Sequence, residues 1–186
     1  MSNEQTISDE EILKTFSDPA KKELAFTWLV KRDQKKIYWF VRRMVIDHDD
    51  ANDLVQEIFI KVWNNLSAFR GESRIIYWIY RIATNITLTF LDRKKRKGAV
   101  PLSEVSNELK DHLYAGKYIN GDTIQLKLQE AILTLPEKQR LVFQLRYYDE
   151  TPYEELSKVL ETSVGALKAS YHHAMKKIEK YMIDHQ

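Results

Sequence analysis

The 186-residue chain contains no cysteine, which excludes disulfides, thiolate catalysis and cysteine-based metal sites and suits a reducing compartment. No apolar run approaches the roughly 20 residues that a membrane-spanning helix requires. The first eleven residues are acidic and polar, and they lack the basic and apolar parts of a signal peptide. We therefore expect a cytoplasmic protein with no membrane insertion.

A strong excess of one charge is also missing, since 29 Lys and Arg against 27 Asp and Glu leave a net charge of +2. Affinity for nucleic acid would thus depend on how charge is distributed. No glycine-rich phosphate loop, nucleophile elbow or zinc-binding pattern occurs. Residues 47–50 lack the glycine and spacing of a calcium-binding loop, and the adjacent His172 and His173 would point about 100° apart on a helix. We predict no enzyme activity, no cofactor and no bound metal.

Nearly every stretch instead carries a helical pattern, and no convincing alternating strand appears. Residues 98–125 differ, because they hold three of the five glycines and show little periodicity, which indicates a linker. The sequence therefore predicts an all-α protein with two small helical domains joined by a flexible linker. The predicted divisions are an N-terminal segment (1–20), a first domain (21–97), the linker (98–123) and a second domain (124–186).

Capping residues predict where several helices begin and end. A capping box at residues 8–11 precedes a short helix that ends at Phe16, and Asp18-Pro19 should open a helix that runs to about Ile46. Residues 48–50 would end that helix and cap the next, and residues 64–73 would form a loop. The remaining helices are expected at 74–93, 126–133, 136–148, 153–160 and from Ser163 onward.

The helix expected over Asp50–Leu66 has two faces. Its apolar residues follow the i, i+3, i+4, i+7 spacing of a buried face: Ala51, Leu54, Val55, Ile58, Phe59, Val62, Trp63 and Leu66. A second stripe runs along the opposite side and consists of Asp53, Gln56, Glu57 and Ile60. Two carboxylates and an amide beside an exposed Ile suit a groove or helix on a basic partner. An ordinary solvated face with one stray Ile would look the same.

The helix expected over Arg74–Arg93 also divides its residues by face. One side gathers Ile75, Ile76, Ile79, Ile82, Ala83, Ile86 and Phe90, and another gathers Arg74, Trp78, Arg81 and Asn85. Two guanidiniums, an aromatic plane and an amide could hold single-stranded nucleic acid, since Arg neutralises phosphate and Trp stacks on a base. A core Trp78 beside solvated arginines is the alternative. The basic run at 93–97 favours nucleic acid, because such density repels itself unless an anion is near.

The C-terminal part has helix-turn-helix proportions. A capping box with a first-turn proline at residues 151–154 starts a short helix, and a longer helix opens at Ser163. The longer helix has an inward seam of Val164, Leu167, Tyr171, Ala174 and Ile178. Its outward side has small residues first and lysines further along, which suits a major groove and its phosphates. An arbitrary helical hairpin could share this pattern.

The order of these motifs resembles the extracytoplasmic-function (ECF) class of bacterial sigma factors in the sigma-70 family. The similar stretches are DANDLVQEIFIKVW, FRGESRIIYWIYRIATN and LPEKQRLVFQLRYYDETPYEELSKVLETSVGALKASYHHAMKKI, within residues 21–97 and 124–182. The resemblance implies a region 2 helical bundle and a region 4 helix-turn-helix. It implies a factor that binds the clamp coiled coil of core RNA polymerase, recognises −35 and −10 promoter elements and promotes DNA opening. Whether an anti-sigma protein also binds stays open.

The resemblance also implies three sets of contact residues. The polymerase would be bound by Asp53, Leu54, Gln56, Glu57 and Ile60. The −10 element, with a base flipped into the loop at 65–70, would be contacted by Asn65, Ser67, Phe69, Arg70, Arg74, Trp78, Arg81, Asn85, Arg93 and Lys94. The −35 element would be contacted by Ser163, Ala166, Lys168, Ala169, Ser170, His172, His173 and Lys176.

The last helix departs from the family pattern, and two other functions stay open. The family often carries Arg where this chain has Ser170, His173 and Met175. Because Arg is the usual reader of guanine, the −35 sequence or the strength of its contact should differ here. A conventional helix-turn-helix regulator would leave the Asp53–Ile60 stripe and the basic run without a role. A helical adaptor that binds only protein would use the stripe but no DNA.

Overall fold

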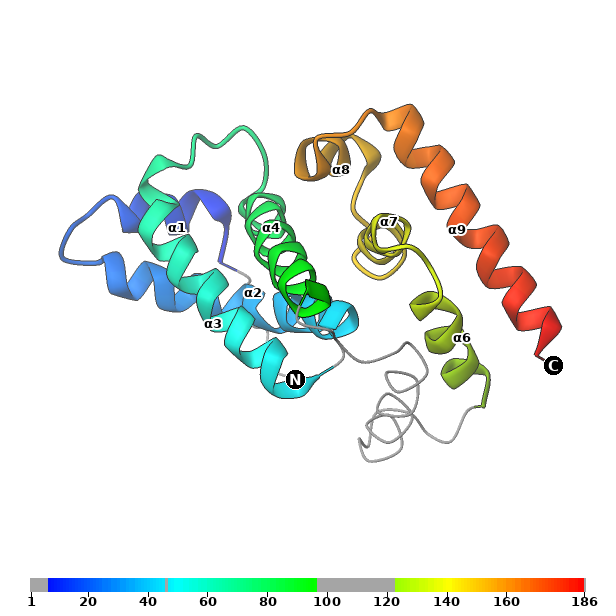
Figure 1. Ribbon diagram of the computed structural model, residues 1–186. Helices are drawn as coiled ribbons and strands as arrows, with labels where there is room; N and C mark the ends of the chain where they lie inside the picture. Colours follow the sequence, from blue (N-terminus) through cyan, green and yellow to red (C-terminus); the bar gives the residue numbers. More distant parts are fainter. Residues whose placement is uncertain (1–6, 46, 97–122, 186) are drawn as a thin grey trace, which may run out of the picture. The chain divides into compact units, whose positions relative to one another are not determined.

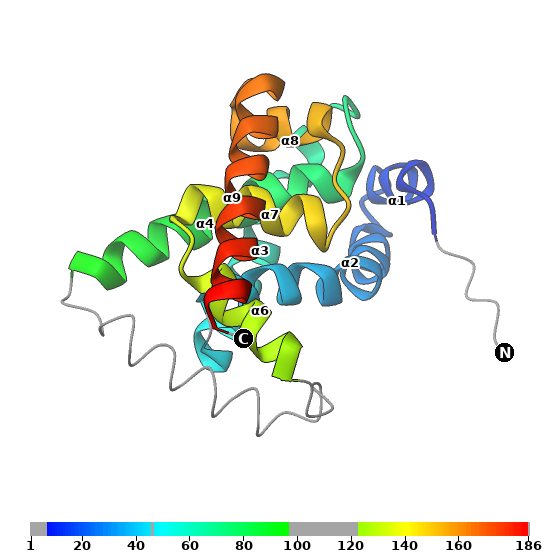
Figure 2. The same ribbon diagram turned by 90° about the vertical axis from the view of Figure 1, so that its right-hand side faces the viewer.

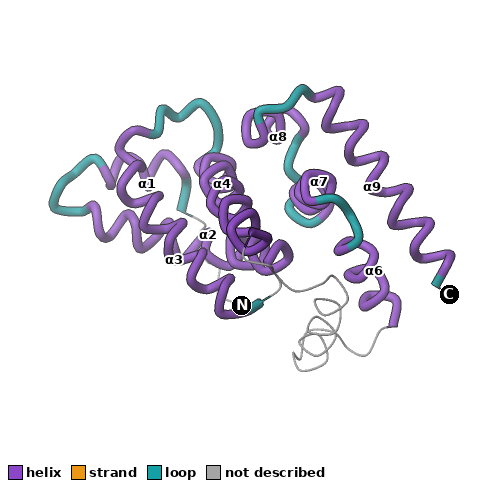
Figure 3. The backbone as a smooth tube through the Cα atoms, in the orientation of Figure 1, coloured by secondary structure: helices purple, strands orange, loops and turns teal. Residues whose placement is uncertain are grey.

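The computed structural model describes residues 7–45, 47–96 and 123–185, and within these ranges every regular element is a helix (Figures 1 and 3). The all-α class is therefore confirmed. The chain divides into two compact units, Met1–Phe90 and Leu91–Gln186. The predicted linker lies almost wholly at 97–122, outside the described residues. No helix in the described part of the chain is both long enough and apolar enough to cross a membrane.

The first unit contains α1 (Asp9–Phe16), α2 (Lys22–Val45), α3 (His48–Asn65), the 3₁₀ helix η1 (Leu66–Ala68) and most of α4 (Ile75–Arg96). The capped start of α1 is confirmed, because the Ser8 hydroxyl accepts a hydrogen bond from the Glu11 amide at 3.1 Å. The start of α2 was predicted too early. Asp18 accepts from the Ala20 amide at 3.0 Å and forms a turn, so the helix begins only at Lys22.

Two predicted breaks in the first unit are wrong. Asp47, rather than residues 48–50, caps α3: its carboxylate accepts from the Asp50 amide at 2.8 Å, and residues 48–50 form the first turn. The loop predicted at 64–73 is shorter, because α3 continues to Asn65 and η1 follows at once. The loop turns at Gly71, whose φ of 72° lies in the left-handed region that glycine adopts without strain.

The core of the first unit forms where α2 packs against both α1 and α3. The apolar face predicted for α3 is confirmed, since Ala51, Leu54, Ile58, Phe59, Val62 and Leu66 are buried while Val55 and Trp63 are half-buried. The Trp63 ring packs edge to face with the rings of Phe16 and Phe26, whose centroids lie 5.6 and 5.0 Å away. These aromatic contacts connect α1, α2 and α3.

The buried face of α4 matches the prediction only in part. Four of the seven predicted residues are buried, namely Ile75, Ile76, Ile79 and Ala83, whereas Ile82, Ile86 and Phe90 are only half-buried. Tyr80, Thr84 and Thr87 are buried instead. The three buried residues share one face at i, i+4, i+7 spacing. Tyr80 is drawn inward by Phe40 of α2, with the two rings edge to face at 5.4 Å. The prediction from apolar residues alone therefore missed part of the face of α4 that meets the core.

The second unit is built from α6 (Thr123–Leu133), α7 (Glu137–Tyr147), α8 (Tyr153–Leu160) and α9 (Val164–Asp184). The long α9 packs against α7, α6 and α8 (Figure 2). Its predicted inward seam is confirmed: Leu167, Ala174 and Ile178 are buried, and Val164 and Tyr171 are half-buried. The start of α6 at Thr123 is three residues earlier than predicted.

The two helices of the helix-turn-helix begin differently. Ser163 caps α9 as predicted, with its hydroxyl accepting from the Ala166 amide at 3.3 Å. The capping box predicted at Thr151 is wrong, because Pro152 is the capping residue and the Thr151 hydroxyl is buried without a hydrogen-bond partner among the described residues. Glu161 ends α8 with a φ of 50°, a left-handed conformation that costs a non-glycine residue free energy.

Candidate functional site

The outer stripe of α3 is exposed. Asp53, Gln56 and Glu57 are exposed, and Ile60 presents 63% of its surface to solvent. Because α3 runs to Asn65, the exposed Asn64 extends the stripe by one turn beyond Ile60. Asn64 was not predicted as part of this stripe, because residues 64–73 were expected to form a loop.

Leu54 does not belong to this stripe. It is 4% exposed and packs on the buried face of α3, so its assignment as a polymerase contact is corrected. Its neighbour Asp53 faces outward because adjacent helical residues point about 100° apart.

The histidine at the start of α3 has both ring nitrogens engaged. Nδ1 of His48 lies 2.8 Å from the Tyr38 hydroxyl, and Nε2 lies 3.0 Å from the Asn52 side-chain nitrogen. In the described ranges, no cluster of three or more His, Cys, Asp or Glu side chains could hold a metal ion. The acidic stretch beside His48 serves as a helix cap.

The exposed face of α4 meets the loop that precedes it. Arg81 and Asn85 are exposed on α4, Arg74 is exposed just before it, and Trp78 is half-buried. The ring of Phe69, from the loop, lies 5.4 Å from that of Trp78 at an interplanar angle of 51°. Trp78 is therefore neither a core residue nor a free surface residue. Trp78 is the residue of α4 against which the loop packs, through Phe69.

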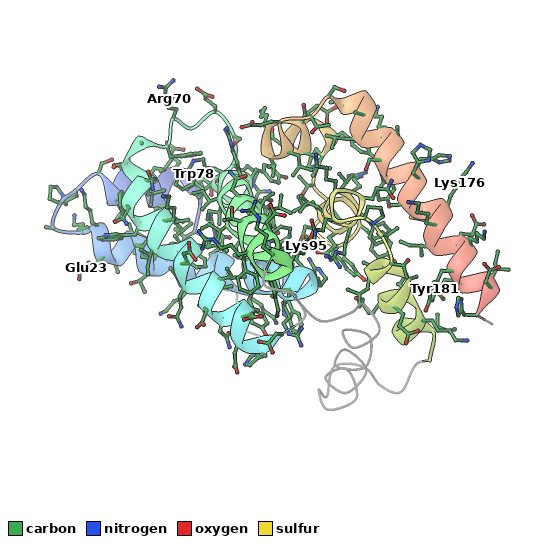
Figure 4. The ribbon with its side chains drawn as sticks, viewed as in Figure 1. Glu23, Arg70, Trp78, Lys95, Lys176 and Tyr181 are labelled. Atoms are coloured by element: carbon green, nitrogen blue, oxygen red, sulfur yellow. The ribbon has the colours of Figure 1, made fainter. Side chains whose placement is uncertain are left out.

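The loop itself presents polar side chains. Asn65, Ser67 and Arg70 are exposed, and Phe69 is half-buried against α4. The Asn65 side-chain amide donates to the Lys61 carbonyl at 2.7 Å, which fixes its orientation. Arg70 points away from the helices of the first unit (Figure 4). At the other end of α4, Arg93 is exposed and Lys94 half-buried in the basic last turn.

An ionic network beside α4 was missed by the sequence analysis. Arg32 on α2 bonds both oxygens of Asp33, at 3.1 and 2.8 Å, and lies 2.8 Å from the Asp9 carboxylate on α1. Burial lowers the pKa of Arg32, but hydrogen bonds and charge from Asp33 and Asp9 outweigh burial, so the pKa is raised. Arg32 and Asp33 are adjacent in sequence, but only the fold shows that Arg32 also contacts Asp9.

The outward side of α9 has the composition that the sequence predicted, and its lysines have defined neighbours. The exposed members are Ser163, Ala166, Lys168, Ala169, His172, His173 and Lys176, while Ser170 is half-buried. The Lys168 ammonium lies 5.6 Å from the centre of the Tyr153 ring, and the Arg146 guanidinium lies 5.1 Å from the same ring. Lys176 points outward from α9 (Figure 4).

A stack of aromatic rings packs α9 against α7. Phe143 of α7 stacks on Tyr147 at 5.1 Å and on Tyr171 of α9 at 5.8 Å. Burial raises the pKa of Tyr171, with a further contribution from Tyr153. These contacts fix which side of α9 faces outward.

Comparison with known families and proteins decides the identity of this two-unit arrangement. The family model for sigma-70 region 2 matches residues 29–97, and that for sigma-70 region 4 matches residues 125–178. The chain is 32% identical to the RNA polymerase sigma-H factor of Pseudomonas aeruginosa, over 84% of this chain and 85% of that protein. It is also 32% identical to the ECF sigma-E factor of Escherichia coli, over 83% of this chain and 85% of that protein. The chain belongs to the ECF sigma factors. As such, it is a transcription initiation factor that binds core RNA polymerase and recognises promoter DNA.

Other ECF sigma factors show the same extent of similarity. The ECF sigma factor SigW of Bacillus subtilis is 30% identical over 86% of this chain and 90% of its own length. The solved structure of CnrH with the cytosolic domain of CnrY, at 20% identity, shares the fold with a TM-score of 0.68 over 96% of this chain and 99% of CnrH.

The sigma factor RpoE of Bartonella quintana, solved in complex with the anti-sigma factor NepR, also shares the fold. Its TM-score is 0.65 at 19% identity, over 84% of this chain and 96% of that one.

Proposed function

We propose that this ECF sigma factor divides its work among three surfaces. The outer stripe of α3 binds core polymerase, the loop at 65–70 with α4 opens and reads the −10 element, and α9 reads the −35 element. The functional domains are residues 21–97 and 124–186. The factor supplies no catalysis of its own, needs no cofactor or metal, and works in the cytoplasm.

The polymerase contact is assigned to α3 because its outer stripe is solvent-exposed while the opposite face is buried. Asp53 and Glu57 supply two carboxylates, Gln56 supplies an amide, and Ile60 supplies apolar surface. A basic helical partner could be recognised by charge and by burial of Ile60. Asn64 extends this surface by one turn.

The opening of DNA is assigned to the loop and α4, and the contact between Phe69 and Trp78 carries this proposal. The Phe69 and Trp78 rings, 5.4 Å apart, place the loop against the start of α4, which Arg74 directly precedes. A base taken out of the stack needs an aromatic surface and hydrogen-bond donors arranged in advance, since extrusion costs a few kcal/mol. The exposed Asn65, Ser67 and Arg70 supply polar groups beside this surface. Along α4, Arg81, Asn85, Arg93 and Lys94 extend the DNA-binding surface.

The −35 contact is assigned to α9. Ala166 and Ala169 let this helix approach a groove closely, and Ser163, Ser170, His172 and His173 offer hydrogen-bonding groups on or beside the outward face. Lys168 and Lys176 supply positive charge for phosphates. Since two solved relatives in fold were captured with partner proteins, one of them an anti-sigma factor, we also propose that an anti-sigma protein binds this chain.

The polymerase assignment can be tested with a pair of matched substitutions. Gln56→Ala should weaken binding to core polymerase by about tenfold or more, because an interfacial hydrogen bond beside charged groups is lost. Gln34→Ala makes the same chemical change at an exposed position of α2 and should leave binding unchanged. Equal affinities for the two variants, measured by fluorescence titration with labelled core enzyme, would remove this assignment.

The opening assignment is tested by transcription from two templates. Phe69→Ala should reduce run-off transcription from a duplex promoter, and a template mismatched across the −10 element should recover part of the loss. Thr27→Ala, at an exposed position of α2 outside the three surfaces, serves as the control and should transcribe normally from both templates. A Phe69→Ala protein with normal transcription from duplex DNA would contradict the role given to the loop.

A further inference from the structure

The first turn of α4 is held by a residue far away in the sequence. The Ile75 amide, the first of the helix, donates to the Asp9 carboxylate of α1 at 2.9 Å, across 66 residues. The first amides of any helix have no acceptor within the helix. Arg74 precedes α4 and has no side-chain acceptor for them. The Asp9 carboxylate takes the place of a capping side chain and faces the positive end of the helix dipole.

Asp9 is itself fixed in place from two sides. The Arg32 guanidinium lies 2.8 Å from one of its oxygens and donates to the Ile7 carbonyl at 2.9 Å. The same guanidinium bonds both oxygens of Asp33, which is 3% exposed. A planar guanidinium held on both sides has little freedom to rotate. The network therefore connects α1, α2 and the start of α4 through directed hydrogen bonds.

The turn that Asp9 holds is the one that meets the loop. Arg74 comes directly before Ile75, and Trp78, which contacts Phe69, lies one turn further along. We propose that Asp9 is a positioning residue for promoter opening: it fixes the start of α4 and thereby the place where the loop rests on Trp78. This inference rests on the proposed role of the loop and α4. Asp9 does not contact DNA itself, because its carboxylate is already occupied and would repel phosphate.

The inference is tested by substitutions on α1 measured in the full-length protein with core polymerase. Asp9→Ala should lower the rate of open-complex formation on duplex promoter DNA by about fivefold to tenfold, the size expected for a lost helix cap. Its affinity for core polymerase should stay within about twofold, and a premelted template should restore activity. Asp9→Asn keeps an acceptor for Ile75 but loses the ion pair, so its defect should be smaller. Glu10→Ala, an exposed neighbour in the same turn, is the control.

A double-mutant cycle separates positioning from plain stability. If Asp9 acts through the loop contact, Asp9→Ala should add little to the opening defect of Trp78→Ala, whereas independent effects would multiply. Multiplying defects, or a loss of core affinity in step with a loss of thermal stability, would overturn the inference. If Asp9→Ala fails to fold, Asp9→Asn and Arg32→Lys take its place in the same cycle.

The cycle also distinguishes failure of this inference from failure of the proposed function. A normal rate of opening for Trp78→Ala would mean that the loop contact does not serve opening. A slow Trp78→Ala beside a normal, folded Asp9→Ala would remove only the role given to Asp9.

Discussion

The two helices assigned to DNA begin in different ways. The first amide of α4 is bound by Asp9, 66 residues away, while the first turn of α9 is capped by Ser163, the residue directly before it. The start of α9 is thus determined locally, and that of α4 depends on the folded first unit. Because the Asp9 contact also holds α1 and α2 in place, it fixes the position of α4 beside the loop more firmly than a local cap would.

The outward faces of α4 and α9 also differ, in the kinds of side chain that they carry. Arg74, Trp78 and Asn85 at α4 combine charge, an aromatic plane and an amide, as suits unstacked single-stranded bases. The outward face of α9 is mostly small and cationic, as suits a helix in the groove of a duplex. Of the four predictions below, three probe this difference and the fourth concerns the turn before α2; they run from the largest expected effect to the smallest.

Removing the cation of the network should destabilise the first unit strongly. Arg32→Ala leaves Asp33 buried without its bidentate partner, and breaking a buried ion pair costs about 3–5 kcal/mol of unfolding free energy. All four tryptophans lie in the first unit, so urea unfolding followed by tryptophan fluorescence measures that unit. Lys31→Ala, an exposed neighbour, is the control. A loss below about 1 kcal/mol would show that the network is not a main support of α4.

Removing the local cap of α9 should have a smaller and more confined effect. Ser163→Ala should cost about 1 kcal/mol and speed hydrogen exchange at the Ala166 amide, which donates a hydrogen bond to the Ser163 hydroxyl. The tryptophan-detected unfolding midpoint should not move, since the second unit contains no tryptophan. A shifted tryptophan midpoint would contradict the local character of this cap.

The two lysines on α9 should differ in their effect on −35 recognition. Lys168 lies over the Tyr153 ring near the start of α9, whereas Lys177 donates to Gln139 at 3.0 Å further along. Lys168→Ala should therefore reduce −35-dependent transcription more than Lys177→Ala. If Lys168 contacts only phosphate, binding should weaken alike on all promoters and the salt slope should fall by about 1. Equal and negligible effects would mean that α9 is not the reader.

The smallest effect concerns the turn before α2. The Ala20 amide and the Lys21 side chain both bond Asp18 and lower the pKa of its carboxyl. A carboxyl with a lowered folded-state pKa stabilises the fold above its ordinary pKa, and this contribution disappears as pH falls through the lowered value. NMR titration should find the Asp18 pKa below the ordinary aspartate range, and Ala20→Pro should return it toward normal. An unshifted pKa in the wild type would contradict this turn.

Periodic patterns were predictable from the sequence, and contacts between distant residues were not. The buried face of α3 and the seam of α9 followed from spacing, because a helix places every third or fourth residue on one side. No sequence pattern predicts the hydrogen bond between Asp9 and Ile75, because these residues are 66 positions apart. The capping box at Thr151 failed because Pro152 took the capping position, and the buried face of α4 was predicted only in part because Tyr80 packs on Phe40.

Permanganate reactivity of promoter thymines tests the central claim most directly, because it detects unstacked bases in the open complex. With core polymerase and duplex promoter DNA, the wild-type factor and the α2 control Thr27→Ala should both make thymines of the −10 element reactive. Asn85→Ala should bind core polymerase normally and leave those thymines largely protected. Normal thymine reactivity with Asn85→Ala, at equal occupancy of core polymerase, would contradict the claim that the exposed face of α4 opens the promoter.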